Sequence, residues 1–139
     1  MAGCSGTPLL KKLGIKPRDV VYAMAPPTDY VRLLGPLPDK ARIVSRMPRQ
    51  ANVIHLFCKQ RTELERLLPS LRERIVQDGM VWVSWPKKAS GIPSSITEDV
   101  IRSIALPLGL VDIKVCAVDE VWSGLKLVIR LQNRKTSPR

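Results

Sequence analysis

The hydrophobic positions of the chain follow two patterns, short unbroken apolar runs and one long stripe at every third or fourth residue. Unbroken runs bounded by Pro, Gly or polar residues predict strands that are buried on both faces. The stripe at positions 64, 67, 68, 71 and 75 keeps its phase across Pro69, which predicts one kinked helix ending at Gly79. The runs predict strands at residues 19–25, 41–45, 52–58, 80–85, 111–118 and 125–131.

Capping signals predict three further helices, one before the first of these runs and two between successive runs. A Ser or Thr at the start of a helix and a Gly just past its end are the usual residues of helix termini. Ser95 also has Glu98 three residues later, which is the spacing of a capping box. The predicted helices begin at Thr7, Thr28 and Ser95, and they end at Gly14, Gly35 and Gly109.

Strands that alternate with helices predict an α/β fold, a mostly parallel sheet of about six strands with helices on both faces. Only about six residues separate the last two runs, which is too short for a crossover, so the last strand should run antiparallel. This arrangement resembles the class I methyltransferase fold, shortened by one strand–helix unit. The resemblance implies a three-layer Rossmann-like domain with strand order 2-1-3-4-6-5.

Length and composition predict one folded domain over residues 1–131, followed by a basic tail over 132–139. Of the 139 residues, 45% are hydrophobic and 25% are charged. We find no apolar run of about 18 residues and no apolar signal segment, so we expect a cytoplasmic protein without membrane contact. The three cysteines form no C-x-x-C pair and there is one histidine, His55, which argues against a disulfide framework and a metal site.

The net charge of +11 favours a negatively charged partner such as nucleic acid. The basic residues are spread along the chain, and no block of five like charges occurs. Two explanations therefore stay open, a nucleic-acid-binding surface and ordinary solvated side chains.

The predicted topology brings distant segments to one edge of the sheet, because parallel strands end at the same edge and ligands of such folds bind there. WPKKASG, residues 85–91, follows the fourth strand, and DEVWSG, residues 119–124, is the predicted turn after the fifth. These two segments should therefore be neighbours. Residues 26–29 and 58–61 leave the first and third strands at the same edge.

The neighbouring segments carry residues typical of a site for an anion. Lysines supply charge, Ser-Gly lets the backbone approach a ligand closely, and tryptophans can stack on a flat group. Solvated lysines and tryptophans at the rim of the core are the alternative explanation. The predicted ligand-binding residues are Trp85, Lys87, Lys88, Ser90, Gly91, Trp122, Ser123 and Lys126.

Signals for catalysis are weak. The turn after the first strand, residues 24–29, has no glycine and two prolines without N–H donors, and Ser45-Arg46 stands where a ribose-binding acid would follow the second strand. We therefore expect a non-enzymatic domain that binds an anionic, phosphate-bearing or nucleotide-like small molecule or a protein partner at the carboxyl edge, with no identified cofactor. The alternatives are a nucleic-acid-binding protein and a divergent S-adenosylmethionine-dependent methyltransferase.

Three motifs together resemble a family of small bacterial proteins catalogued as a domain of unknown function. They are SGTPL at residues 5–9, WPKKASG at 85–91 and VCAVDEVWSGLKLVIR at 115–130. The similarity spans nearly the whole chain. It implies no activity, cofactor or catalytic residue, and it marks residues 5–8, 85–91 and 119–126 as the segments that define the family.

Overall fold

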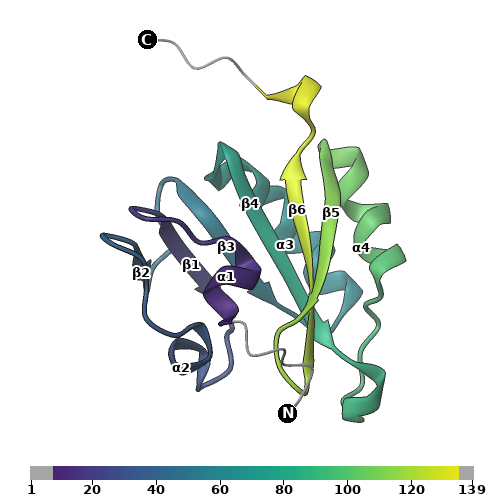
Figure 1. Cartoon of the computed structure of the whole chain (residues 1–139). Helices are drawn as coiled ribbons and strands as arrows, with labels where there is room; N and C mark the ends of the chain where they lie inside the picture. The colour runs from purple at the N-terminus through teal and green to yellow at the C-terminus, as the bar shows by residue number, and fades with distance from the viewer. Residues whose placement is uncertain (1–7, 135–139) are drawn as a thin grey trace.

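The computed structural model describes residues 8–134, which form one mixed sheet with helices on both faces (Figure 1). The strands are β1 (Val20–Met24), β2 (Arg42–Val44), β3 (Ala51–Phe57), β4 (Ile75–Pro86), β5 (Leu110–Ala117) and β6 (Trp122–Ile129). The helices are α1 (Leu9–Leu13), α2 (Tyr30–Leu34), α3 (Arg61–Arg74) and α4 (Glu98–Ala105), with short 3-10 helices η1 (Lys88–Ser90), η2 (Leu106–Leu108) and η3 (Leu131–Asn133).

The strand order is β2-β1-β3-β4-β6-β5. β1 pairs in parallel with β2 and β3, and β3 pairs in parallel with β4. β6 lies between β4 and β5 and runs antiparallel to both. The predicted α/β class, strand order and antiparallel last strand are confirmed.

A hydrophobic cluster lies on each face of the sheet. α1 and α2 cover one face, where Leu13 and Leu34 are fully buried, and α3 and α4 cover the other, where Leu68 and Ile101 are fully buried (Figure 1). Trp82 is buried on the α1 side, and its indole N–H donates to the carbonyl of Leu13 at 3.0 Å, which fixes α1 to the sheet. None of the helices in the described part of the chain is long and apolar enough to cross a membrane.

α3 ends earlier than predicted. Leu64, Leu68 and Leu71 are buried and Pro69 lies inside the helix, but the helix ends at Arg74. Ile75 has extended backbone and begins β4, five residues before the predicted start of that strand at residue 80. An apolar residue at this position continues the helical stripe and also suits a buried strand, so the sequence pattern did not separate the two.

Two helix starts also differ from the prediction. Thr97 caps α4, because its hydroxyl oxygen accepts from the N–H of Val100 at 3.2 Å. Ser95, the predicted cap, instead accepts from the N–H of Arg61 at 2.7 Å and so joins this loop to the start of α3. α2 begins after Asp29 rather than Thr28. The predicted cap Thr7 lies outside the described residues.

β6 begins three residues before the prediction, so Trp122 and Ser123 belong to the strand and not to the turn. Asp119 explains the early start. Its carboxylate oxygen accepts from the N–H groups of Val121 and Trp122, both at 2.8 Å, which closes the turn with a side chain. Such local capping by Asp makes a tighter turn than the apolar pattern indicated.

Candidate ligand site at the carboxyl edge of the sheet

The two motif segments are neighbours, as the topology predicted. Pro86 at the end of β4 lies opposite Trp122 at the start of β6. The N–H of Lys87 donates to the carbonyl of Val121 at 2.7 Å. The ends of β4 and β6 are therefore fastened together at the carboxyl edge.

A cavity of about 390 Å³ opens at the carboxyl ends of β1 and β3. From β1 the chain goes outward to β2 and then returns to β3 on the other side of β1, so the strand order reverses between β1 and β3. Ligands of open α/β sheets bind at such a reversal. We call this the switch-point cavity; it is lined by Ala25, Pro26, Pro27, Phe57, Cys58, Lys59, Glu63 and Trp122.

An aromatic stack forms the inner wall of the switch-point cavity. Trp122 meets Phe57 edge to face with ring centres 5.1 Å apart, and Phe57 stacks on His55 at 4.2 Å. Burial lowers the pKa of His55 to about 3, so the imidazole is neutral. Its Nδ1 lies 2.8 Å from the Tyr30 hydroxyl and its Nε2 lies 2.7 Å from that of Ser84, so both nitrogens are hydrogen-bonded. The histidine is thus a packed support for the wall.

Charge in the switch-point cavity comes from Lys59 and Glu63. Burial, and then the negative charge of Glu63, raise the pKa of Cys58 to about 12, so this thiol stays protonated at neutral pH. The Glu63 carboxylate also accepts from the N–H of Lys59 at 3.4 Å, which ties the start of α3 to the end of β3. Among residues 8–134, no three His, Cys, Asp or Glu side chains are grouped so that they hold a metal ion.

The turn after β1 is strained. Ala25 has a φ of +56°, in the left-handed region that favours glycine. Pro26 and Pro27 follow it in the lining of the switch-point cavity. Proline has no N–H, so this turn offers a ligand fewer backbone donors than a glycine-rich turn would.

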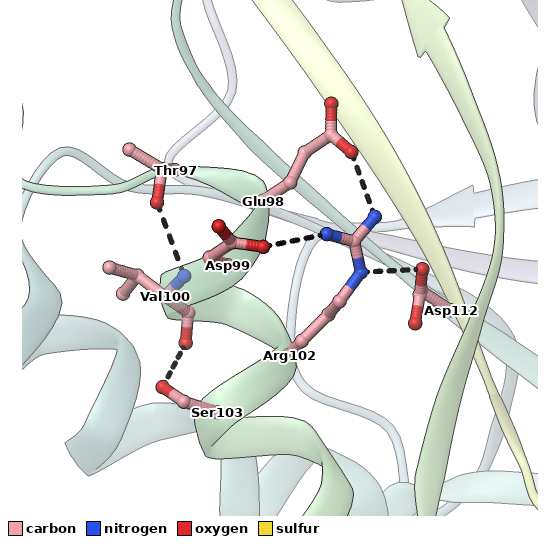
Figure 2. A network of polar contacts seen from close by, with 7 residues as sticks. All are labelled: Thr97, Glu98, Asp99, Val100, Arg102, Ser103 and Asp112. Atoms are coloured by element: carbon pink, nitrogen blue, oxygen red, sulfur yellow. Dashed lines mark hydrogen bonds and ion pairs between the residues drawn. The ribbon is translucent and has the colours of Figure 1, made fainter.

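A second cavity, of about 450 Å³, lies beyond the end of β4 and reaches the start of α4. Arg102 in its wall donates to Glu98 at 2.9 Å, to Asp99 at 3.0 Å and to Asp112 of β5 at 2.9 Å (Figure 2). Three carboxylates therefore balance the positive charge of this guanidinium. We call this the β4 cavity; its lining includes Trp85, Pro86, Lys88, Ile92, Ser94 and Ile96.

The structure divides the predicted ligand-binding residues between the two faces of the sheet. Trp85 packs against the α3 and α4 cluster, and Trp122 against the α1 and α2 cluster, so the two rings do not stack on one ligand. Ser123 lies opposite Trp85. Lys126 is opposite Trp82, in the middle of the sheet and away from the carboxyl edge. Neighbouring residues of a strand point to opposite faces of the sheet, whereas the prediction assigned all of these residues to one site at the carboxyl edge.

The WPKKASG segment has a clear structural part. The Ser90 hydroxyl donates to the carbonyl of Lys87 at 2.7 Å and accepts from the N–H of Ile92 at 3.1 Å. Gly91 has a φ of +77° and ends this turn. Lys88 lines the β4 cavity, and Lys87 lines neither of the two cavities. Phe57, Cys58 and Glu63 were not among the predicted ligand-binding residues, although residues 58–61 were predicted to lie at this edge.

Several solved structures that are similar to this chain are methyltransferases. A SAM-dependent methyltransferase from Aquifex aeolicus has a TM-score of 0.58 and 13% identity, covering 87% of each chain. Magnesium protoporphyrin IX methyltransferase from Synechocystis with bound SAH has 0.56 and 12%, covering 86% of this chain and 77% of that one. Fibrillarin from Aeropyrum pernix in complex with S-adenosyl-L-methionine has 0.55 and 10%, covering 91% and 71%. No family model and no curated protein matches the chain.

These neighbours confirm the methyltransferase-like topology, and at this level of identity they establish the fold alone. The main functional prediction was a non-enzymatic domain that binds an anionic ligand or a protein partner. Compared with these neighbours, that prediction is wrong. They favour the alternative of a divergent methyltransferase. The prediction relied more on the absence of glycine from the turn after the first strand than on the strand order of the whole sheet. The resemblance to an uncharacterised bacterial family stays a prediction.

Proposed function

We propose that this chain is a divergent S-adenosylmethionine-dependent methyltransferase whose methyl donor binds in the switch-point cavity. One observation carries the proposal. The cavity of about 390 Å³ lies where the strand order reverses, in a sheet similar to that of magnesium protoporphyrin IX methyltransferase, which is solved with SAH and with SAM. This is the position at which open α/β sheets bind their ligands.

The lining fits the chemistry of the donor. S-adenosylmethionine has a sulfonium cation, an adenine ring, and an amino-acid end with an ammonium and a carboxylate. The half-buried Trp122 ring suits stacking or a cation over its face, and the Glu63 carboxylate suits a positive group. Lys59 suits the donor's carboxylate. When bound, the donor supplies a methyl group on a sulfonium sulfur, which a nucleophile takes to leave a neutral thioether.

Two positions depart from this fit. Pro26 and Pro27 remove backbone donors from the turn after β1, and Ser45 and Arg46 follow β2 without an acid for a ribose hydroxyl. The β1 side of the cavity therefore contributes shape, and the contacts that hold a ligand come from the β3 and β6 sides. Trp122 and Glu63 are the residues on which this hold depends.

Calorimetry with S-adenosylmethionine and S-adenosylhomocysteine tests the proposal. Both should bind the unmodified protein. Glu63→Gln and Trp122→Phe should each weaken binding about tenfold or more, since they remove a charge-assisted contact and a large stacking ring. Glu65→Gln is the matched control, because Glu65 lies on the same helix but pairs with Arg61 at the surface, and it should leave binding unchanged.

Two results would overturn the proposal. The first is the absence of binding heat for either compound at millimolar concentration. The second is equal weakening by Glu63→Gln and Glu65→Gln, which would show that the overall charge of α3 matters and the cavity does not. Thermal unfolding of each variant separates loss of binding from loss of fold.

A further inference from the structure

Four lysines gather on the α1 side of the sheet and line neither cavity. Lys114 of β5 and Lys126 of β6 lie directly opposite each other in antiparallel register, so their side chains leave the same face. Lys12 of α1 reaches β5, because its Nζ donates to the carbonyl of Ala117 at 3.1 Å. Lys16 follows α1. We call these four residues the lysine cluster.

Like charges repel one another at Lys126 in the lysine cluster. The pKa of Lys126 is lowered by burial and by the charges of Lys114 and Lys16. The Nζ of Lys114 approaches the carbonyl of Lys12 at 3.5 Å, and that of Lys126 lies 3.7 Å from where a side chain at Gly14 would begin. Like charges directly opposite each other on paired strands destabilise a sheet. The arrangement therefore has an energetic cost in the protein alone.

Carboxylates do not offset this cost. Within residues 8–134, none of the four lysines takes part in an ion pair. One carboxylate lies at the margin, since Asp19 accepts from the backbone N–H of Lys16 at 2.9 Å. Lys12 and Lys114 each give one N–H to a neutral carbonyl, and an ammonium has further donors. Arg102 differs from these lysines, because it forms ion pairs with three carboxylates.

We propose that the lysine cluster binds the phosphate backbone of a nucleic-acid strand. Its ammonium groups come from α1, the loop after it, β5 and β6, so one face of the sheet presents several lysines to the phosphates of a single strand. Trp122 shares this face of β6 with Lys126, and Gly124 lies between them. A bound strand therefore runs toward the switch-point cavity. The net charge of +11 steers such a polyanion to the protein.

Fluorescence anisotropy with a labelled single-stranded RNA of about 16 nucleotides tests this binding. The variant combines Lys114→Gln with Lys126→Met, and the matched control combines Arg46→Gln with Arg49→Gln, two exposed residues between β2 and β3. The cluster variant should bind about tenfold or more weaker, and the slope of log K against log salt should fall by about 1.4, or 0.7 for each lost phosphate contact. The control should lose less than about threefold.

Thermal unfolding gives a second readout. Because Lys114 and Lys126 repel each other, the cluster variant should be at least as stable as the unmodified protein at low salt, even while it loses RNA. Equal loss of RNA in both double variants would overturn the proposal, since it would mean diffuse charge only. So would the absence of RNA binding at low salt, or full competition by millimolar inorganic phosphate, which would identify a small anion as the occupant. Calorimetry with the methyl donor concerns other residues, so the two proposals fail separately.

Discussion

The Nε2 atom of His55 lies 2.7 Å from the hydroxyl oxygen of Ser84. This contact joins β3 to β4 inside the sheet, and Tyr30 hydrogen-bonds to the other ring nitrogen from α2. Both His55 and Ser84 are fully buried. The hydrogen bonds satisfy a neutral imidazole, and no acidic side chain is among its hydrogen-bond partners, so a charge on this ring is costly.

We expect the free energy of unfolding to decrease as the pH falls from about 6.5. The unfolded chain takes up a proton at His55 near the ordinary pKa of 6.5, whereas the folded protein does so only near 3. The unfolded state therefore binds more protons between these values, and stability falls by about 2 kcal/mol between pH 6.5 and about pH 5. Urea denaturation at a series of pH values measures this loss.

His55→Gln is the control for the pH dependence, because His55 is the one histidine of the chain. The variant should be less stable at neutral pH, and its stability should hardly change between about pH 6.5 and 5, above the range in which most carboxylates titrate. An unchanged slope in the variant would show that the pH dependence arises elsewhere.

The three carboxylates around Arg102 should not contribute equally. Asp112 is 26% exposed and comes from β5, whereas Asp99 is 94% exposed and lies on the same helix as Arg102. The hydrogen bond with Asp112 is also the strongest of the influences that raise the pKa of Arg102. Asp112→Asn should therefore lower the Tm by a few degrees, and Asp99→Asn should leave it nearly unchanged. Equal shifts of the Tm in the two variants would contradict a role of Asp112 in holding α4 against β5.

Gly79 is required by close packing of the backbone, and Gly91 by its conformation. A side chain at Gly79 would begin 2.8 Å from the carbonyl oxygen of Asn52, whereas one at Gly91 would meet nothing within 4 Å. Gly79→Ala should cost about 2 kcal/mol or more, through a clash between β4 and the neighbouring β3. Gly91→Ala should cost about 1 kcal/mol, from its positive φ alone. Chemical denaturation of both variants measures the difference, and a larger loss at Gly91 would reverse this assignment.

Trp82 should control the attachment of α1. Trp82→Phe removes the N–H that donates to Leu13 and leaves a gap in the α1 side of the core. We expect a loss of about 2 kcal/mol and faster trypsin cleavage at Lys11 and Lys12, because a helix of five residues is not stable without packing. Cleavage at an unchanged rate would mean that the remaining contacts of Leu9 and Leu10 hold the helix.

The fold could be predicted from the sequence because each level of pattern agreed with the next. Apolar runs, glycines after helices and the short last connection all indicated the same topology. The boundaries failed where one residue suits two structures. Ile75 continues a helical stripe and also begins a buried strand, and Asp119 closes a turn through its side chain, which no apolar pattern records.

The candidate site could be predicted only in part. The carboxyl edge follows from the topology, and the prediction that the ends of β3 and β4 lie there is correct. It did not separate the two faces at that edge, because the face of Trp85 or Trp122 depends on the pairing of β4 with β6, and a shift of one residue reverses it. The lysine cluster depends on contacts between α1 and β5 about 100 residues apart, which no local pattern contains.

The position of β6 between β4 and β5 has a consequence for how the protein is made. β6 is synthesised after β4 and β5 but lies between them in the sheet, so these two strands lack the partner that joins them until residues 122–129 have been made. Until then both expose unpaired strand edges, which favour aggregation. The sheet is therefore completed only after β6 has been synthesised, and a ribosome that stops before Trp122 releases a chain without the antiparallel pairing of β6 to β4 and β5.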